Sequence, residues 1–266
     1  MFSVVIRNKN EASNLDKCLG MLTNIYGDDV HEIILVDNNS TDDSIVIAKK
    51  YNCKIVTIDK FTYGKALNIG INEAKSKYVL LLSSHSMPIG NSFFKNTYNI
   101  LKKNDKWAGA RFINSVANFE RAIKNNFKVV NPLNEGLLAA CCVINKEVWE
   151  EIKFDEHIVA AEDKDWSNKV ISRGYEILEI NETFLYYIQR DFKGILKKNK
   201  IETIAGHQLM NKKFKYSKFE IYLIFLKNLV LINSKKYILL VYNSYLSLKT
   251  NLEIFNTLNR KKTHNK

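Results

Sequence analysis

The regular alternation of strand-like and helix-like segments in the first 83 residues is the strongest constraint on the fold. Short β-rich runs predict strands over residues 2–6, 33–36, 54–58 and 78–82. Segments of helical composition lie between them, over residues 13–25, 43–51 and 65–75, with Ser13 and Asp42 placed to cap two of the helix starts. Strands that alternate with helices in this way predict an α/β fold with a parallel sheet and crossover helices.

Polar residues follow each of the four expected strands, over residues 7–11, 37–42, 59–64 and 83–86. In an open sheet of this kind, ligands bind beyond the carboxyl ends of the strands. A polar loop after one strand is ordinary, but four at one edge predict a polar cleft about the width of a nucleotide.

The charge is distributed unevenly along the 266 residues. Residues 1–190 carry 24 basic and 24 acidic side chains, whereas residues 191–266 carry 16 basic and 4 acidic ones. We therefore expect a neutral domain over 1–190 and a basic tail over 191–266 that docks at an anionic surface. Nucleic-acid binding, the alternative, is supported only by the charge of the tail.

The N-terminal residues lead directly into a strand pattern, without the charged and apolar regions of a secretion signal. The four cysteines, Cys18, Cys53, Cys141 and Cys142, lack metal-ligand spacing. Both features predict a cytoplasmic protein with reduced thiols.

The second half begins with an apolar run over 136–144, expected as a strand, and a helical segment over 146–152. Three short strings follow at 154–156 (Phe-Asp-Glu), 162–166 (Glu-Asp-Lys-Asp-Trp) and 173–175 (Arg-Gly-Tyr). Trp166 and Val170 are four residues apart, so we expect both to face the core.

Together these strings resemble glycosyltransferase family 2. Residues 34–44 are similar to the strand and Val-Asp-Asp-Gly-Ser-Thr-Asp motif of the family, and residues 63–70 to its Gly-x-Ala-x-Asn-x-Gly segment. The strings of the second half resemble its Phe-Asp-Glu, Glu-Asp-x-Asp and Arg-x-x-x-Gly-Tyr series. The resemblance covers about residues 2–190 and implies the GT-A fold, in which a Rossmann-like nucleotide-binding half is fused to an acceptor-binding half.

The resemblance implies a set of residues that bind the nucleotide sugar: Arg7, Asn10, Glu11, Asp37, Asn39, Lys65, Asn68, Ser84 and His85. Asp37 would contact the nucleoside, and Arg7 with its neighbours would hold the base from the other side. Lys65 would neutralise part of the diphosphate, and Gly64 would let the backbone approach the donor. Glu11 at a helix start and Lys65 in a first helical turn also have ordinary structural interpretations.

The chain departs from the family after the fourth strand, where Asp-x-Asp is replaced by Ser83-Ser84-His85. His85 stands at the position of the metal-contacting Asp. Imidazole suits manganese-like cations better than magnesium and adds no negative charge. Two interpretations stay open: His85 binds a divalent cation, Mn or Mg, or it only donates a hydrogen bond to the diphosphate.

An inverting sugar transfer needs a carboxylate that accepts the proton of the acceptor hydroxyl. Asp163 is the expected base, and Glu162 or Asp165 would orient the acceptor or share this role. Acidic residues at a helix start also stabilise the helix, and both interpretations can hold together.

The basic tail mixes aromatic residues with lysines over residues 214–266, and no apolar run reaches the length of a spanning helix. We expect amphipathic helices on the inner face of the membrane, with packing on the catalytic domain or a second subunit as the alternative. The expected function is transfer from a nucleotide sugar to a glycan or polyprenyl-linked acceptor of a bacterial surface polysaccharide, such as capsule or O-antigen.

Two other classes of function are weighed against this one. A nucleotidyltransferase would show a glycine-rich loop after the first strand, and residues 7–11 contain no glycine. A non-catalytic relic that binds nucleotide sugars would not need Glu162 and Asp163, which are both present.

Overall fold

A computed structural model describes residues 1–188, 191–210, 215 and 217–263. The chain forms two compact units, Met1–Lys212 and Lys213–Lys266. Helix α9 (Phe192–Leu209) belongs to the first unit, although the sequence placed it in the tail. The functional boundary expected after residue 190 stays a prediction.

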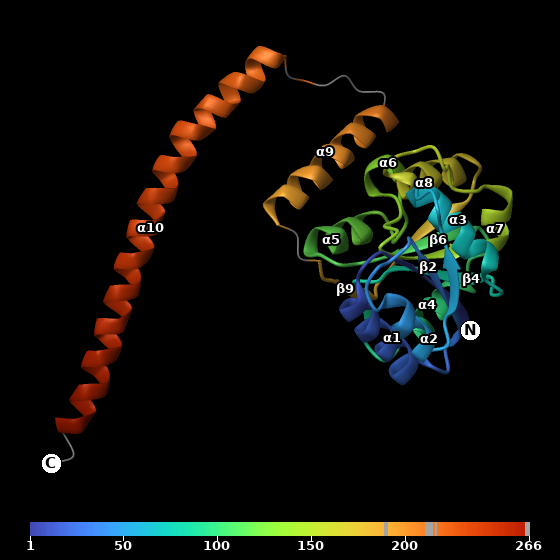
Figure 1. Ribbon diagram of the computed structural model, residues 1–266, viewed down its shortest axis with the longest axis horizontal. Coiled ribbons are helices and arrows are strands. Elements are labelled where there is room, and N and C mark those ends of the chain that lie inside the picture. Colours follow the sequence, from blue (N-terminus) through green and yellow to red (C-terminus); the bar gives the residue numbers. More distant parts are fainter. Residues whose placement is uncertain (189–190, 211–214, 216, 264–266) are drawn as a thin grey trace. The chain divides into compact units, whose positions relative to one another are not determined.

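A seven-stranded sheet forms the centre of the part described over residues 1–188, in the order β3-β2-β1-β4-β7-β6-β8 (Figure 1). Its strands are β1 (Phe2–Asn8), β2 (Val30–Asp37), β3 (Lys54–Thr57), β4 (Tyr78–Ser83), β6 (Trp107–Phe112), β7 (Cys141–Asn145) and β8 (Glu176–Ile180). Strand β7 is antiparallel to both of its neighbours, and the other pairs are parallel. The ends of the six parallel strands therefore lie at one edge of the sheet, together with the start of β7.

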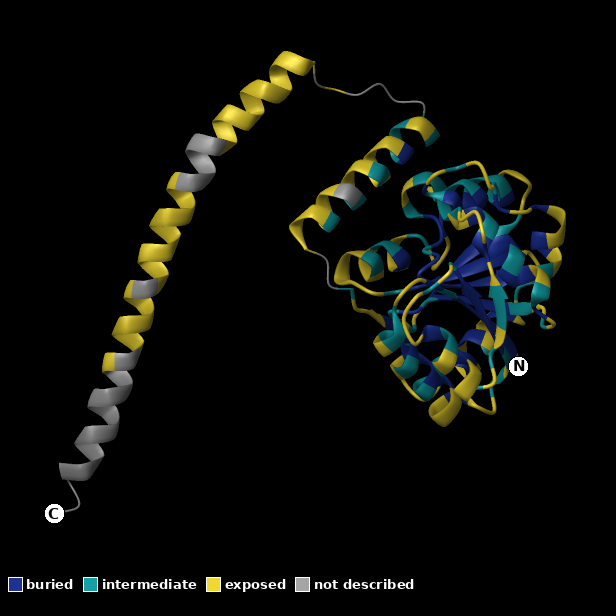
Figure 2. Ribbon diagram, in the orientation of Figure 1, coloured by how far each residue is buried: buried dark blue, intermediate teal, exposed yellow. Residues whose placement is uncertain are grey.

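Helices cover both faces of the sheet. One core cluster contains residues of α1 (Ala12–Tyr26), α2 (Ser44–Lys50) and α4 (Phe93–Leu101), and the other contains residues of α3 (Tyr63–Glu73), α7 (Lys146–Glu151) and α8 (Glu162–Ser172). Figure 2 shows the buried strands between these helices, whose outer faces are exposed. Helices α5 (Val116–Lys124) and α6 (Pro132–Glu135) complete the domain, and β5 (Ser86–Ile89) pairs with β9 (Thr183–Tyr186) in a separate two-stranded sheet.

Alternation along β1 decides which side chains face which helices. Val4 and Ile6 pack in the α1 cluster, whereas Val5 packs in the α3 and α8 cluster. Because successive side chains of a strand point to opposite faces, Arg7 lies on the α8 side and Asn8 on the α1 side.

The helix caps differ from those expected. Helix α1 begins at Ala12, so Ser13 lies inside it, and Asp43 rather than Asp42 is the N-cap of α2. The Asp42 carboxylate instead accepts hydrogen bonds from the backbone N–H of Ala12 at 2.8 Å and from that of Ser44 at 3.1 Å. One carboxylate with two oxygens thus serves the starts of two helices.

The strand expected over 136–144 is shorter, because β7 begins only at Cys141. Two backbone amides before it are bound by side chains of α8: Leu137 N–H donates to Ser167 Oγ at 2.9 Å, and Ala139 N–H donates to Asp163 Oδ2 at 3.0 Å. These amides are therefore unavailable to a sheet ladder. The predicted burial of Trp166 and Val170 on α8 is confirmed, since both are 0% exposed.

The second unit contains α10 (Lys218–Thr263). Its apolar residues include two exposed runs of six, 221–226 and 237–242. A helix has about 3.6 residues per turn, so each run covers the whole circumference, and the apolar surface is not confined to one side as expected. None of the described helices combines the length and apolar character needed to cross a bilayer.

Candidate active site

The loops after β1 and β2 are joined around the carboxylate of Asp37, which is 1% exposed. Its Oδ1 accepts hydrogen bonds from Asn8 Nδ2 at 3.1 Å and from Ser40 Oγ at 2.6 Å, and its Oδ2 accepts one from Ser40 N–H at 2.8 Å. Asp37 thus stands at the end of β2, as the sequence indicated. Its contact with a nucleoside stays a prediction.

Asn10 and Asn39 shape the same two loops. Asn10 Oδ1 accepts a hydrogen bond from Thr41 N–H at 2.7 Å, and Asn39 Nδ2 donates to the carbonyl of Ile58 at 3.2 Å. Both asparagines have left-handed backbone conformations, with φ of 51° and 50°. Asparagine tolerates this region better than most residues, which gives both positions a conformational reason for their identity.

The loop after β4 brings His85 close to the start of α1. His85 Nδ1 lies 3.8 Å from Glu11 Oε1, and the imidazole packs edge-on against Tyr186. Ser84, which is buried, donates its N–H to the carbonyl of Arg7 at 3.3 Å. The exits of β1 and β4 therefore meet at one place.

The pair of Glu11 and His85 fits a divalent cation in part. An imidazole nitrogen and a carboxylate oxygen at 3.8 Å can be two ligands of one cation. The described residues contain no group of three or more His, Cys, Asp or Glu side chains that could hold a metal. The remaining ligands would therefore have to come from phosphate oxygens, as for a cation that binds together with the donor.

The start of α3 brings Gly64 and Lys65 to the rim of the sheet. Thr62 Oγ1 caps the helix by accepting from Lys65 N–H at 3.1 Å. A Cβ atom on Gly64 would lie 2.2 Å from the carbonyl oxygen of Asp155. Packing against this loop is therefore enough to require glycine here, and the close approach of the backbone to the donor stays a prediction.

Asn68 joins α3 to the segment after α7. Its Nδ2 donates to the Phe154 carbonyl and to Glu156 Oε1, both at 2.9 Å. Its Oδ1 accepts from Trp149 Nε1 at 3.0 Å and from Phe154 N–H at 3.1 Å. Protein groups thus use both ends of the amide, and contact with the donor stays a prediction.

The acidic pair lies at the start of α8, after Ala161, whose φ of 67° is left-handed. Glu162 is buried, whereas Asp163 is only partly covered. Asp163 accepts hydrogen bonds from Ala139 N–H through Oδ2 and from Lys164 N–H through Oδ1. Asp163 is therefore the acid whose carboxylate is held by two backbone amides.

Burial changes the proton affinity of both acids. It raises the pKa of Asp163, although the bond from Ala139 and the charge of Arg7 oppose this. Burial and then the charge of Asp163 raise the pKa of Glu162 to about 7, again against Arg7. A carboxylate with a raised pKa is a stronger base than an exposed one, which suits proton abstraction. The neighbouring Asp165 pairs with Lys169 at 2.7 Å.

Arg7 lies against the acidic pair and not beside Asp37. Its Nη2 donates to the Ala139 carbonyl at 2.9 Å, its Nη1 is 3.5 Å from Glu162 Oε1, and its guanidinium lies over the Tyr63 ring. The alternation of β1 predicts this direction, so the sequence contained a signal for it. The expected contact with the nucleotide base stays a prediction.

Direct contacts therefore connect the loops after β1, β2 and β4 to the acidic pair along one edge of the sheet. Asn8 contacts Asp37, while Arg7 contacts Ser84 through its backbone and Glu162 through its side chain. Sequence reasoning identified the acids and the loops, but it missed Ala139 and Ser167, which are not ionisable and carry no motif of their own.

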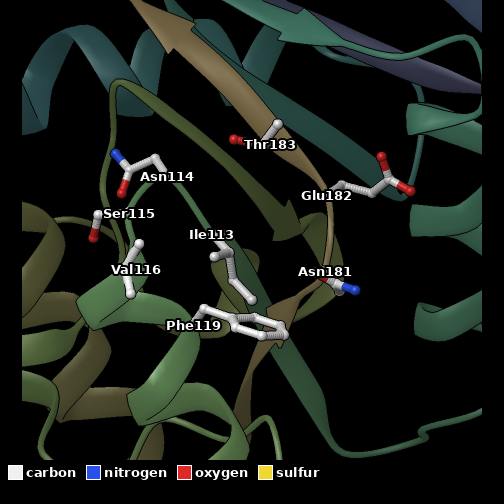
Figure 3. A pocket seen from close by; sticks show the side chains of 8 residues that line it. All are labelled: Ile113, Asn114, Ser115, Val116, Phe119, Asn181, Glu182 and Thr183. Carbon is white, nitrogen blue, oxygen red and sulfur yellow. The ribbon is translucent and has the colours of Figure 1, made fainter.

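An open pocket of about 430 Å³ lies where β6 and β8 end (Figure 3). It is lined by Ile113, Asn114, Ser115, Val116, Phe119, Asn181, Glu182 and Thr183. Because β6 and β8 run in the same direction as β4, this pocket lies at the same edge of the sheet as the loops after β1, β2 and β4. The sequence did not predict it, because neither strand was assigned.

Comparison with known proteins supports this arrangement. A poly(ribitol-phosphate) beta-glucosyltransferase of Bacillus spizizenii is 27% identical over 210 residues, which are 71% of this chain and 32% of that protein. Glycosyltransferase AglE of Haloferax volcanii is 23% identical over 74% of this chain and 69% of its own length. The chain thus spans about a third of the first relative.

A mannosyltransferase of Pyrobaculum calidifontis, solved with GDP-mannose and Mn²⁺, has a TM-score of 0.61 at 14% identity, over 81% of this chain and 65% of its own. The likeness shows that the fold is GT-A, as the sequence predicted. The family model described as glycosyl transferase family 2 matches residues 3–218. The chain belongs to glycosyltransferase family 2.

Proposed function

We propose that this protein is an inverting glycosyltransferase that moves a sugar from a nucleoside diphosphate to a hydroxyl group of a glycan or lipid-linked acceptor. The observation that carries the proposal is the position of Glu162 and Asp163 at the sheet edge that holds the loops after β1, β2 and β4. The name of one relative, a poly(ribitol-phosphate) beta-glucosyltransferase, supports transfer to a polymer.

In this proposal Asp163 accepts the proton of the attacking hydroxyl. The acceptor oxygen forms a bond to the anomeric carbon while the bond from that carbon to the diphosphate breaks. The electron pair of the broken bond leaves with the nucleoside diphosphate, and attack from the opposite face inverts the anomeric centre. The two backbone amides on Asp163 fix the direction of its carboxylate.

The diphosphate needs positive charge, because negative charge develops on it as the bond breaks. Lys65 in the first turn of α3 would supply part of it. A divalent cation, when bound, would be held by His85 and Glu11 and would neutralise the rest. The separation of 3.8 Å between these two side chains supports this assignment.

The tail would hold the enzyme at an anionic inner membrane surface. Residues 191–266 carry 16 basic and 4 acidic side chains, and α10 exposes apolar groups around its circumference. Basic residues are attracted to anionic headgroups while apolar groups enter the interface. The charge excess favours lipid over a second copy of the same tail, because two such tails repel each other.

The direct test is the release of nucleoside diphosphate from a panel of sugar donors, with and without Mn²⁺, by the full chain. Asp163→Asn should abolish transfer and still bind the donor, whereas Asp16→Asn, a half-exposed carboxylate of α1, should behave as wild type. Normal transfer by Asp163→Asn would show that Asp163 is not the base. Donor binding without turnover by the wild type would support the relic, and pyrophosphate release would support a nucleotidyltransferase.

A further inference from the structure

Arg7 is a largely covered cation that lies between β1, α8 and the segment before β7. Its side chain is 12% exposed, and it reaches from β1 to α8 and to the segment before β7. Glu162 is the carboxylate that pairs with it among the described residues, and the Glu162 side chain is itself 6% exposed. The Nε and Nη1 atoms of Arg7 make no hydrogen bond within the described part of the chain, so the Ala139 carbonyl and the charge of Glu162 compensate for its lost hydration.

Ala139 connects Arg7 to the proposed base. Its carbonyl accepts a hydrogen bond from Arg7 Nη2 at 2.9 Å, and its N–H donates to Asp163 Oδ2 at 3.0 Å. Arg7 therefore acts on both acids at once, on Glu162 through charge and on Asp163 through the backbone of Ala139. No contact joins the Arg7 side chain to the loop of Asp37 among the contacts found in the described residues.

We propose that Arg7 is a positioning residue, which places a positive charge against Glu162 and orients Asp163 through Ala139, and is not a ligand of the nucleotide. This proposal rests on the proposed function, because it assigns Arg7 a role in proton abstraction. It also gives a reason for a cation at the end of β1, directly after the buried apolar residues Val4, Val5 and Ile6.

The charges that face the acidic pair come from several elements. Besides Arg7 from β1, the charged and titratable groups that face the pair are Lys164 on α8, Arg111 of β6 and the thiol of Cys142 on β7. The pKa of Cys142 is raised well above neutral pH by burial, so the thiol carries no charge there. Arg111 lies 3.6 Å from Glu179, which also pairs with Arg121. Arg7 is the cation that lowers the pKa of Glu162, whereas the charge of Asp163 raises it and acts more strongly.

Removing the Arg7 charge should raise the pKa of both acids, because Arg7 lowers each of them. The base works in its ionised form, so the acidic limb of the pH profile should move to higher pH. An opposite charge at this distance shifts a carboxylate by about 1 pH unit or more.

The test compares Arg7→Met with Arg7→Lys in the full chain, with kcat and the KM for the donor measured between about pH 5.5 and 9.5. Arg7→Met should move the acidic limb of kcat up by about one pH unit and change the donor KM by less than about twofold. Arg7→Lys should recover most of the wild-type profile. An unmoved limb with a large rise in donor KM would make Arg7 a nucleotide ligand and overturn the proposal.

A second measurement does not depend on activity. The free energy of unfolding in urea, measured as a function of pH, reports the pKa of Glu162. The pH at the midpoint of this dependence should be higher in Arg7→Met than in wild type. The double variant Arg7→Met with Glu162→Gln removes both buried charges, so it should fold and lose this pH dependence. Identical pH dependence in wild type and Arg7→Met would refute the proposal, even if the wild type were found to transfer no sugar.

Discussion

Replacement of Glu162 by glutamine should stabilise the protein at alkaline pH and have a much smaller effect at acidic pH. The glutamine side chain is neutral at every pH and similar in size to protonated glutamic acid. The pKa of Glu162 is raised from 4.5 to about 7 by burial and by the charge of Asp163. The wild type therefore has to ionise a buried carboxyl group as the pH rises, and the variant does not.

The sign follows from linkage between proton binding and folding. Because the pKa of Glu162 is higher in the folded protein, its contribution to stability is complete below pH 4.5 and is lost as the pH rises to about 7. Between about pH 5 and pH 8.5 this loss amounts to about 2.5 kcal/mol, at about 1.4 kcal/mol per pH unit of pKa difference. Packing differences between Gln and Glu cancel, because they are the same at both pH values.

Urea unfolding of wild type and Glu162→Gln at these two pH values gives the comparison directly. The free energy of unfolding of the variant should gain about 2.5 kcal/mol on the wild type between the acidic and the alkaline condition. Glu151→Gln, an exposed carboxyl of α7, serves as the matched control and should show no such gain. If the free energies of unfolding of variant and wild type differed by the same amount at both pH values, the pKa of Glu162 would not be raised by folding and this reasoning would be wrong.

Four further changes test other parts of the structure. Asn68→Ala should lower the free energy of unfolding by about 2–4 kcal/mol, measured in urea, because four hydrogen bonds are lost. A loss below about 0.5 kcal/mol would show that these hydrogen bonds do not stabilise the contact between α3 and the segment after α7. Ala161→Gly should relieve the strain of a left-handed backbone conformation and so keep or raise the thermal midpoint of unfolding. It should also lower kcat, because Ala161 directly precedes the acidic pair at the start of α8. An unchanged kcat would show that the position of α8 has no effect on catalysis. His85→Ala should abolish any stimulation by Mn²⁺ with little change in stability; stimulation that persists would place the cation elsewhere. Truncation after Lys212 should abolish binding to anionic vesicles in a flotation assay and leave any binding to neutral vesicles unchanged. Full binding of the truncated chain to anionic vesicles would show that the tail does not attach the protein to the membrane.

The first four strands could be predicted from the sequence because each is a β-rich run between helical segments. Strand β6 could not, because all six of its residues are buried and the sheet leaves no alternation of polar and apolar positions. It also contains Arg111, whose charge is accommodated by the carbonyls of Glu135 and Gly136 and by Glu179. Such partners come from distant parts of the chain and are not visible in local sequence.

The residue types of the candidate site were predictable, but several of their partners were not. Asp37 and Asp163 stand where the motifs indicated. Arg7 and Asn68 were expected to bind the nucleotide sugar, and in the structure both contact protein groups. Strand alternation directs Arg7 toward α8, and the partners of Asn68 come from a loop more than 80 residues away. Motifs thus indicate which side chains matter, and the fold decides what each one touches.

The reversed direction of β7 has a consequence for how such enzymes are searched for new activities. In a fully parallel sheet every group at the working edge follows a strand, so a mutational survey would target strand exits. Here Ala139 precedes a strand and still lies between Arg7 and Asp163. Surveys that aim to retune this enzyme should therefore include the segment 136–140 before β7, whose backbone groups contact Arg7, Asp163 and Ser167.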